Sequence, residues 1–142
     1  MNFTLAGFDP AGDGFSDSST ENLTRIGDMA REFDVTLRAL RFYEDKGLIN
    51  PIRNGATRLY RISDRKRLHF VLLGRRVGFS LRDIKQMIDL YDPVGSNVRQ
   101  LKVILEKSER QRGRLEKQRE DLDKASVELD GLIESVRLKL AA

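Results

Sequence analysis

The residues best suited to chemistry are arginines and aromatic side chains grouped between positions 36 and 46. Arg38 and Arg41 are three residues apart, so they share one face if the segment is helical. A guanidinium group can bind guanine O6 and N7 together, or it can bind a phosphate. Tyr43 can donate its hydroxyl to a phosphate while its ring packs on the protein. This chemistry fits nucleic-acid recognition, and the alternative is a solvated basic face with no ligand.

A second group of basic residues follows directly and includes Arg53, Arg58 and Arg61. Asn54-Gly55 lies between short β-competent flanks, and both residues tolerate positive φ, which favours a two-residue hairpin turn. We therefore expect a basic hairpin, or wing, that also carries Tyr60.

Two short helices must position the first group of residues. Apolar residues recur at helical spacing from Ile26 to Phe33, which predicts a first helix. Thr36 is a good N-cap for a second helix, and Gly47 is a typical residue just beyond a helix end. Two helices separated by a tight turn indicate a helix-turn-helix.

Two further helices are expected after the hairpin. Ser63 is the expected N-cap of a helix over residues 64–77 that Gly78 ends. Ser80 is the expected N-cap of the next helix, which runs from Leu81 to about Tyr91.

Residues 97–140 have a heptad pattern without proline. One position of the heptad holds Leu101, Ser108, Leu115, Leu122, Leu129 and Val136, and a companion set three residues on holds Ile104, Gln111, Gln118, Ala125 and Leu132. This pattern predicts a coiled-coil helix of roughly 65 Å at about 1.5 Å per residue. Because such a helix needs a partner, we expect a homodimer whose interface residues are Leu101, Leu105, Leu115, Leu122, Leu129, Leu132 and Val136.

The charge is distributed unevenly along the chain. The net charge is +4, but residues 1–22 contain four acidic and no basic side chains, and we expect them to form a disordered acidic arm. Residues 23–78 contain 13 Lys and Arg against 6 Asp and Glu, whereas residues 79–142 are nearly balanced. A basic block beside a neutral one indicates a polyanionic partner for the block alone.

Several classes of function are excluded or disfavoured by composition. The chain has no cysteine, which excludes disulfides and thiolate metal sites, and its single histidine cannot form a metal cluster alone. No apolar run approaches the roughly 18 residues of a membrane span. The N-terminal segment lacks the features of a secretory signal, so we expect a cytoplasmic protein. We find no phosphate loop, catalytic carboxylate pair or activated nucleophile, and we expect no enzymatic activity, cofactor or metal.

Several motifs in a fixed order resemble the MerR family of bacterial winged-helix regulators. The motifs are Thr24-Arg25-Ile26-Gly27-Asp28-Met29-Ala30, Val35-Thr36-Leu37-Arg38-Ala39-Leu40-Arg41-Phe42-Tyr43-Glu44, Gly47-Leu48-Ile49, Thr57-Arg58-Leu59-Tyr60 and Val77-Gly78-Phe79-Ser80-Leu81-Arg82-Asp83-Ile84. The similarity covers about half of the chain, and the helix that follows also fits. The resemblance implies a mostly α fold, with a winged helix-turn-helix domain over residues 23–91 and an antiparallel dimerisation helix over residues 97–140.

The resemblance also implies roles for individual residues. The second helix would enter the major groove of double-stranded promoter DNA, and the wing would bind the backbone. The implied DNA-binding residues are Arg25, Thr36, Arg38, Arg41, Phe42, Tyr43, Arg53, Arg58, Tyr60 and Arg61. Phe42 occupies a position where the family often has tyrosine, which would remove one hydroxyl contact. Ala39 and Ala56-Thr57 are also less usual choices there.

The mechanism implied by the resemblance is distortion of promoter DNA. A dimer that bends and untwists an over-long spacer brings two promoter elements into phase for RNA polymerase, at a cost of several kcal/mol. The absence of cysteine argues against thiolate metal or iron–sulfur sensing. A small organic effector near Tyr91 is one option, and a purely structural Tyr91 is the other. The sequence leaves open the effector, the target genes, activation versus repression, and a coiled-coil adaptor as the alternative class.

Overall fold

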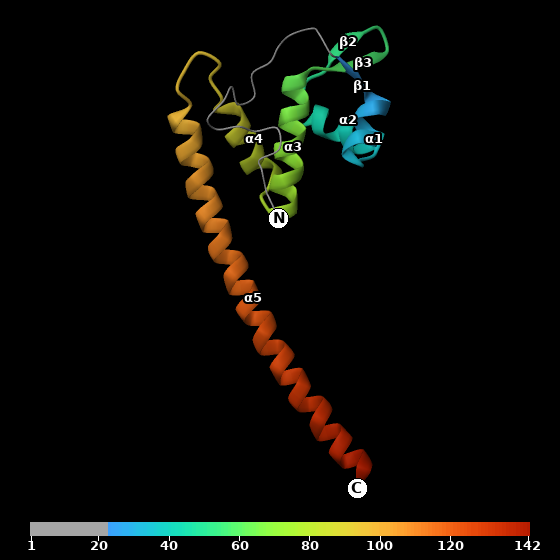
Figure 1. The fold of residues 1–142 in the computed structure, drawn as a ribbon, viewed down its shortest axis with the longest axis vertical. Coiled ribbons are helices and arrows are strands. Elements are labelled where there is room, and N and C mark those ends of the chain that lie inside the picture. Colours follow the sequence, from blue (N-terminus) through green and yellow to red (C-terminus); the bar gives the residue numbers. More distant parts are fainter. Residues whose placement is uncertain (1–22) are drawn as a thin grey trace. The chain divides into compact units, whose positions relative to one another are not determined.

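The computed structural model describes residues 23–142, so the predicted acidic arm over residues 1–22 lies outside the described residues. The elements run in the order β1 (Thr24–Arg25), α1 (Ile26–Phe33), α2 (Leu37–Asp45), β2 (Ile52–Asn54), β3 (Thr57–Tyr60), α3 (Ile62–Val77), α4 (Leu81–Asp89) and α5 (Val98–Ala141). Figure 1 shows this arrangement. The described part of the chain is mostly α-helical, as predicted from the sequence.

Helices α1 and α2 form the predicted helix-turn-helix. Asp34 ends α1 in the left-handed conformation with φ 53°, which an aspartate tolerates better than most residues. Thr36 is the N-cap of α2, as predicted, and its side-chain oxygen accepts a hydrogen bond from the backbone N–H of Ala39 at 3.0 Å. Gly47 has φ 73° and lies just after α2, so the expected helix stop is confirmed.

The wing is a hairpin, but its turn differs from the prediction by one residue. Asn54 pairs with Thr57, so the two turn residues are Gly55 and Ala56 and not Asn54 and Gly55. Gly55 takes the positive φ of 63°, and Asn54 remains in the extended strand. A type II′ hairpin turn needs a positive φ only at its first central residue, and glycine is suited to that position. This explains why the turn lies one residue later than predicted.

The sequence did not predict a third strand. Strand β1 pairs with β3 in an antiparallel register that joins Thr24 to Tyr60 and Arg25 to Leu59, giving the strand order β1-β3-β2. Two residues are too few to show an alternating pattern, so only the tertiary pairing reveals this strand.

Helix α3 begins earlier than predicted. Its N-cap is Arg61 and not Ser63, which lies inside the first turn. The buried carboxylate of Asp64 accepts a hydrogen bond from the backbone N–H of Arg61 at 3.0 Å and so satisfies the helix start. Ser80 caps α4 as predicted, accepting from the N–H of Asp83 at 3.1 Å, but α4 ends at Asp89, two residues before Tyr91.

Two core clusters fill the N-terminal unit, and α3 contributes to both. The N-terminal cluster contains Met29, Leu40, Ile49, Tyr60 and Leu68. The central cluster contains Leu48, Phe70, Val71, Ile84, Met87 and Ile88. Figure 1 shows α3 between the α1–α2 pair and α4, which is consistent with this double role. Packing against α3 therefore fixes the helix-turn-helix relative to α4.

Helix α5 spans the boundary between two compact units, one ending at Ile104 and the other running from Leu105 to Ala142. In the first unit, Leu101 packs against the central cluster, and the buried side chain of Gln100 donates to the carbonyl oxygen of Met87 at 2.8 Å. Leu101, predicted as an interface residue, therefore packs on its own chain in this turn of α5.

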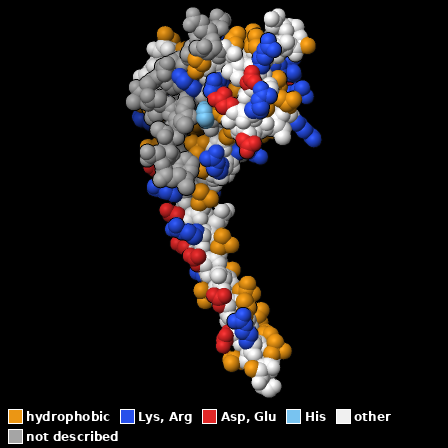
Figure 2. Space-filling model, turned by 45° about the vertical axis from the view of Figure 1, so that its right-hand side comes forward, with side chains coloured by type: hydrophobic (Ala, Val, Ile, Leu, Met, Phe, Trp, Pro, Cys, Tyr) orange, Lys and Arg blue, Asp and Glu red, His pale blue; other side chains and the backbone are white. Residues whose placement is uncertain are grey.

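The second unit is a single helix with an exposed apolar stripe. The exposed large hydrophobic side chains include the predicted interface residues Leu105, Leu115, Leu122, Leu129, Leu132 and Val136. Figure 2 shows hydrophobic side chains gathered along one edge of this helix and charged ones along the other. Among residues 23–142, no helix combines the length and apolar character that a membrane crossing needs.

Candidate nucleic-acid interface

The exposed face of α2 carries both arginines of the first group. Arg38 and Arg41 are exposed, whereas Leu40 on the opposite side is fully buried in the N-terminal cluster. A helix turns by about 100° per residue, so the two guanidinium groups lie about 60° apart around the axis. The two arginine side chains predicted to contact DNA are therefore presented to solvent together.

The two aromatic residues of α2 have different environments. Tyr43 is half-buried and packs against both core clusters, so its ring anchors the helix. Phe42 is exposed, its ring centroid lies 5.8 Å from that of Tyr43, and the Lys46 ammonium lies 5.6 Å from the Phe42 centroid. Phe42 thus supplies an apolar surface and holds a cation beside it, without the hydroxyl that a tyrosine would offer.

Glu44 joins α2 to the wing, and sequence reasoning did not identify it as a site residue. Its carboxylate accepts a hydrogen bond from Arg53 Nη2 on β2 and another from Arg58 Nε on β3, each at 2.7 Å. The Glu44 side chain is only 15% exposed, and Arg58 is half-buried while Arg53 remains exposed. Because bonds between ionised groups are short and strong, this carboxylate holds the wing in a fixed position against α2.

The two arginines also determine the charge state of Glu44. Burial alone would raise the pKa of Glu44, but hydrogen bonds and charge from Arg58 and Arg53 outweigh it and lower the pKa below its usual 4.5. Glu44 is therefore ionised at neutral pH. One negative charge in contact with two positive ones leaves an excess of positive charge at the wing.

A second carboxylate holds the base of the wing. Asp64 is buried and accepts from the backbone N–H of Asn50 at 3.0 Å in addition to its bond from Arg61. Arg61 Nη1 donates to the carbonyl oxygen of Asn50 at 3.1 Å. Arg61, predicted to bind DNA, thus also has a structural role between the segment after α2 and the start of α3.

Tyr60 does not lie where the prediction placed it. Its side chain is fully buried in the N-terminal cluster, so it cannot contact a surface ligand in this structure, and its predicted role as a wing contact is wrong. Its hydroxyl has no hydrogen-bond partner among the described residues. Burial first, and then the charge of Glu44, raise its pKa to about 12. Side chains alternate between the two faces of a strand, and Tyr60 lies on the face of β3 that packs on the core. The sequence alone did not show which face of this short strand is buried.

The remaining predicted residues lie at the edges of this surface. Arg25 is exposed on β1, and Thr36 is exposed at the N-terminus of α2, where its side chain already caps the helix. Lys and Arg side chains stand out across the N-terminal unit at the upper right of Figure 2. The structure thus links the predicted residues of α2 and of the wing through Glu44.

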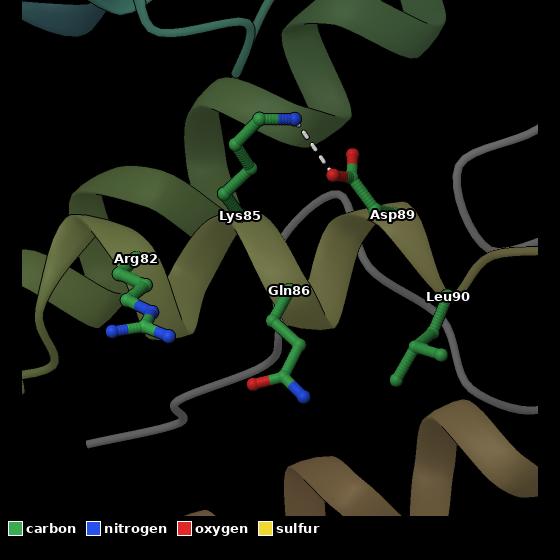
Figure 3. Close-up of a pocket in the computed structure, with 5 residues that line it drawn as sticks. All are labelled: Arg82, Lys85, Gln86, Asp89 and Leu90. Carbon is green, nitrogen blue, oxygen red and sulfur yellow. Dashed lines mark hydrogen bonds and ion pairs between the residues drawn. The ribbon is translucent and has the colours of Figure 1, made fainter.

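Outside this surface, one open depression lies on α4. Figure 3 shows an open depression on α4 lined by Arg82, Lys85, Gln86, Asp89 and Leu90, in which Lys85 Nζ lies 2.6 Å from Asp89 Oδ2. Within residues 23–142, no cluster of histidine or acidic side chains is placed to hold a metal ion.

Tyr91, the option for an effector site, and His69, the single histidine, both contact other side chains. Tyr91 is partly buried and packs against the central cluster. The ring of His69 packs edge-on to Phe33, with centroids 4.5 Å apart. Partial burial and the charge of Arg65 lower the pKa of His69 below its usual 6.5, so it is neutral at pH 7.

Comparison with known sequences identifies two matching family models. The model described as "MerR HTH family regulatory protein" matches residues 24–90, and the one described as "MerR, DNA binding" matches residues 65–132. Together they extend from β1 into α5 and cover more than half of the chain. A probable heavy metal-dependent transcriptional regulator from Haemophilus influenzae is 37% identical over 81 residues, which is 56% of this chain and 63% of that protein. The chain spans about half the length of the curated relatives it matches, for example 44% of a SoxR homolog from Chromobacterium violaceum.

Comparison with solved structures gives the same fold. A transcriptional regulator of the MerR family from Bacillus cereus superimposes with a TM-score of 0.62 at 29% identity, over 76% of this chain and 78% of that one. HiNmlR, described as a MerR family regulator lacking the sensor domain and bound to promoter DNA, gives a TM-score of 0.57 at 20% identity, over 71% of this chain and 79% of that one.

Proposed function

Because this chain belongs to the MerR family of helix-turn-helix regulatory proteins, we propose that it binds promoter DNA as a homodimer and regulates transcription there. The observation that carries the proposal is the joined basic surface of α2 and the wing, with Arg38 and Arg41 exposed on the helix and Arg53 exposed on the hairpin. A helix fits the major groove of B-DNA, and an adjoining hairpin can bind the phosphate backbone.

Each basic residue has a distinct role in this proposal. Arg38 lies near the N-terminus of α2 and reads a base edge, because the start of a recognition helix contacts the bases. Arg41 and Arg53 bind phosphates on either side of the groove and set the position of the protein on the duplex. Glu44 touches no DNA in this account and fixes the geometry of the wing.

The homodimer is proposed from the apolar stripe of α5. Leu122, Leu129 and Val136 are spaced by seven residues and are exposed in the single chain. A lone exposed helix with such a stripe gains stability when the stripe packs against a second helix, and an antiparallel copy of itself satisfies both chains. The dimer would separate two DNA-binding units so that they bind an inverted repeat.

We further propose that the bound dimer distorts its promoter for RNA polymerase and that its effector is not a thiolate-bound metal. The relative from Haemophilus influenzae is described as heavy metal-dependent, but these 142 residues contain no cysteine. Backbone contacts at both ends of a site supply the several kcal/mol that bending and untwisting cost. The proposal involves no catalysis and no cofactor. A small organic molecule is compatible with it as the effector.

The proposal is tested by the salt dependence of affinity for duplex DNA. Phosphate binding releases counterions, so the logarithm of affinity should fall linearly and steeply with the logarithm of salt concentration. Fluorescence anisotropy with a labelled duplex measures this slope. An affinity that is weak and independent of salt would support the alternative, a coiled-coil adaptor whose N-terminal unit docks a protein.

A further inference from the structure

Leu37 is an exposed apolar residue at the start of α2. Its side chain is 41% exposed, although leucine three residues later, at position 40, is fully buried. The neighbouring Val35 and Tyr43, by contrast, are partly buried and pack on the N-terminal cluster. Folding of the described chain therefore leaves part of the apolar surface of Leu37 available to a ligand.

The position of Leu37 places it on the face of α2 that carries the arginines. Leu37 precedes Arg41 by four residues, so the two side chains are neighbours on one face, and Arg38 is adjacent in sequence. As the first residue of the helix, Leu37 lies in the turn that contacts base edges when a helix enters the major groove.

We infer that Leu37 contacts the C5-methyl group of a thymine beside the base pair read by Arg38, an inference that rests on the proposed DNA-binding function. The thymine methyl is the apolar group that base edges present in the major groove. Leucine can remove that methyl from water but cannot form a hydrogen bond, so it selects T over C by apolar contact alone. Leu37 is thus a specificity-determining residue, complementary to the hydrogen bonding of Arg38.

The other exposed apolar residue of α2 is less suited to this role. The ring of Phe42 already lies against Lys46 and Tyr43. Phe42 also lies in the second turn, farther from the N-terminus that enters the groove. The apolar contact with a base is therefore assigned to Leu37.

The test removes the thymine methyl group from the DNA and the Leu37 side chain from the protein, each in a separate experiment. The best duplex is first selected by the full-length protein from random sequence, and each thymine of it is then replaced in turn by deoxyuridine. Affinity is measured for the wild type, for Leu37→Ala and for Val94→Ala. Val94 is an exposed aliphatic residue in the loop before α5 and serves as the matched control. Thermal unfolding establishes that each variant is folded.

For the wild type and for Val94→Ala, one thymine per half-site should be sensitive, and loss of its methyl should weaken binding about fourfold. Leu37→Ala should bind the thymine and uracil duplexes equally well. Uracil that is tolerated at every position, or an equal loss in Leu37→Ala, overturns the inference while leaving DNA binding intact. If the wild type selects no duplex at all, the proposed function fails and this inference fails with it.

Discussion

At the scale of single residues, one carboxylate connects the two parts of the proposed interface. Glu44 lies on α2 and binds arginines from both strands of the wing, at separations of 9 and 14 residues along the chain. A phosphate that approaches the wing meets arginines already held in place, so less side-chain freedom is lost on binding. The position of Glu44 thus determines how the wing meets DNA.

Replacement of Glu44 by glutamine should lower the free energy of unfolding by about 1–2 kcal/mol at neutral pH, because two charge-assisted hydrogen bonds weaken. The folded pKa of Glu44 lies below 4.5, so its contribution is complete above that pH and is lost as pH falls through the folded value. Urea unfolding at several pH values should show the two proteins converging below pH 4.5. A difference that stays constant with pH would contradict this role.

The substitution Tyr60→Phe tests whether Tyr60 is a core residue or contacts DNA. The buried hydroxyl of Tyr60 has no partner among the described residues, so removing it should leave stability unchanged or raise it by up to about 1 kcal/mol. Affinity for DNA should not change. A large loss of affinity in a stably folded Tyr60→Phe protein would mean that the ring leaves the core when DNA binds.

Arg38→Ala and Arg53→Ala should have different effects on DNA binding. Arg38→Ala should relax sequence preference at one base pair by about 1–3 kcal/mol and leave binding to random DNA nearly unchanged. Arg53→Ala should weaken binding to all sequences and reduce the salt slope by about one for each protomer, while Arg58 still holds Glu44. Competition anisotropy with specific and random duplexes measures both effects. Identical behaviour of the two variants would refute the division between base and backbone contacts.

At the scale of elements, local signals in the sequence predicted most helix boundaries. Thr36 and Ser80 cap their helices, and Gly47 and Gly78 take positive φ at the helix ends, because each of these effects depends on a few adjacent residues. The prediction was less accurate for the hairpin, where two neighbouring residue pairs can both form the turn. Gly55 alone satisfies the hairpin turn, so the turn moved by one residue from the expected position.

Contacts between distant residues could not be predicted in the same way. The pairing of Glu44 with Arg58, the hydrogen bond from Asn50 to Asp64 and the pairing of β1 with β3 all join residues far apart in sequence. Charge and spacing identified Arg53 and Arg58 as candidates but gave no partner for them. The same limit placed Tyr60 at the surface, because inward and outward positions of a three- or four-residue strand look alike in sequence.

The helix α5 provides the test of the dimer. Leu122→Asp combined with Leu129→Asp places two charges in the apolar stripe, and burial of unpaired charges should prevent association. Sedimentation equilibrium should therefore show monomers for this double variant and dimers for the wild type. Val127→Asp is a matched control because Val127 is also exposed but lies outside the heptad stripe. A dimeric double variant would show that the chains associate through another surface.

At the scale of the whole molecule, charge is concentrated where the proposed ligand binds. Residues 23–78 contain 13 basic and 6 acidic side chains, whereas residues 79–142 contain 13 and 12. A basic unit attracts the phosphate backbone over several ångströms and speeds association, while a nearly neutral C-terminal segment lets two like chains approach. The distribution of charge thus suits a protein that binds DNA with one part and itself with another.

We propose that a dimer of this chain recognises a promoter. The most direct measurement is selection of genomic fragments by the purified protein, followed by footprinting on the fragment bound best. We expect an inverted repeat inside an over-long spacer between promoter elements, protected on both halves and hypersensitive to cleavage at its distorted centre. Selected fragments that bind no better than random ones, or a single protected half-site, would contradict promoter recognition by a dimer.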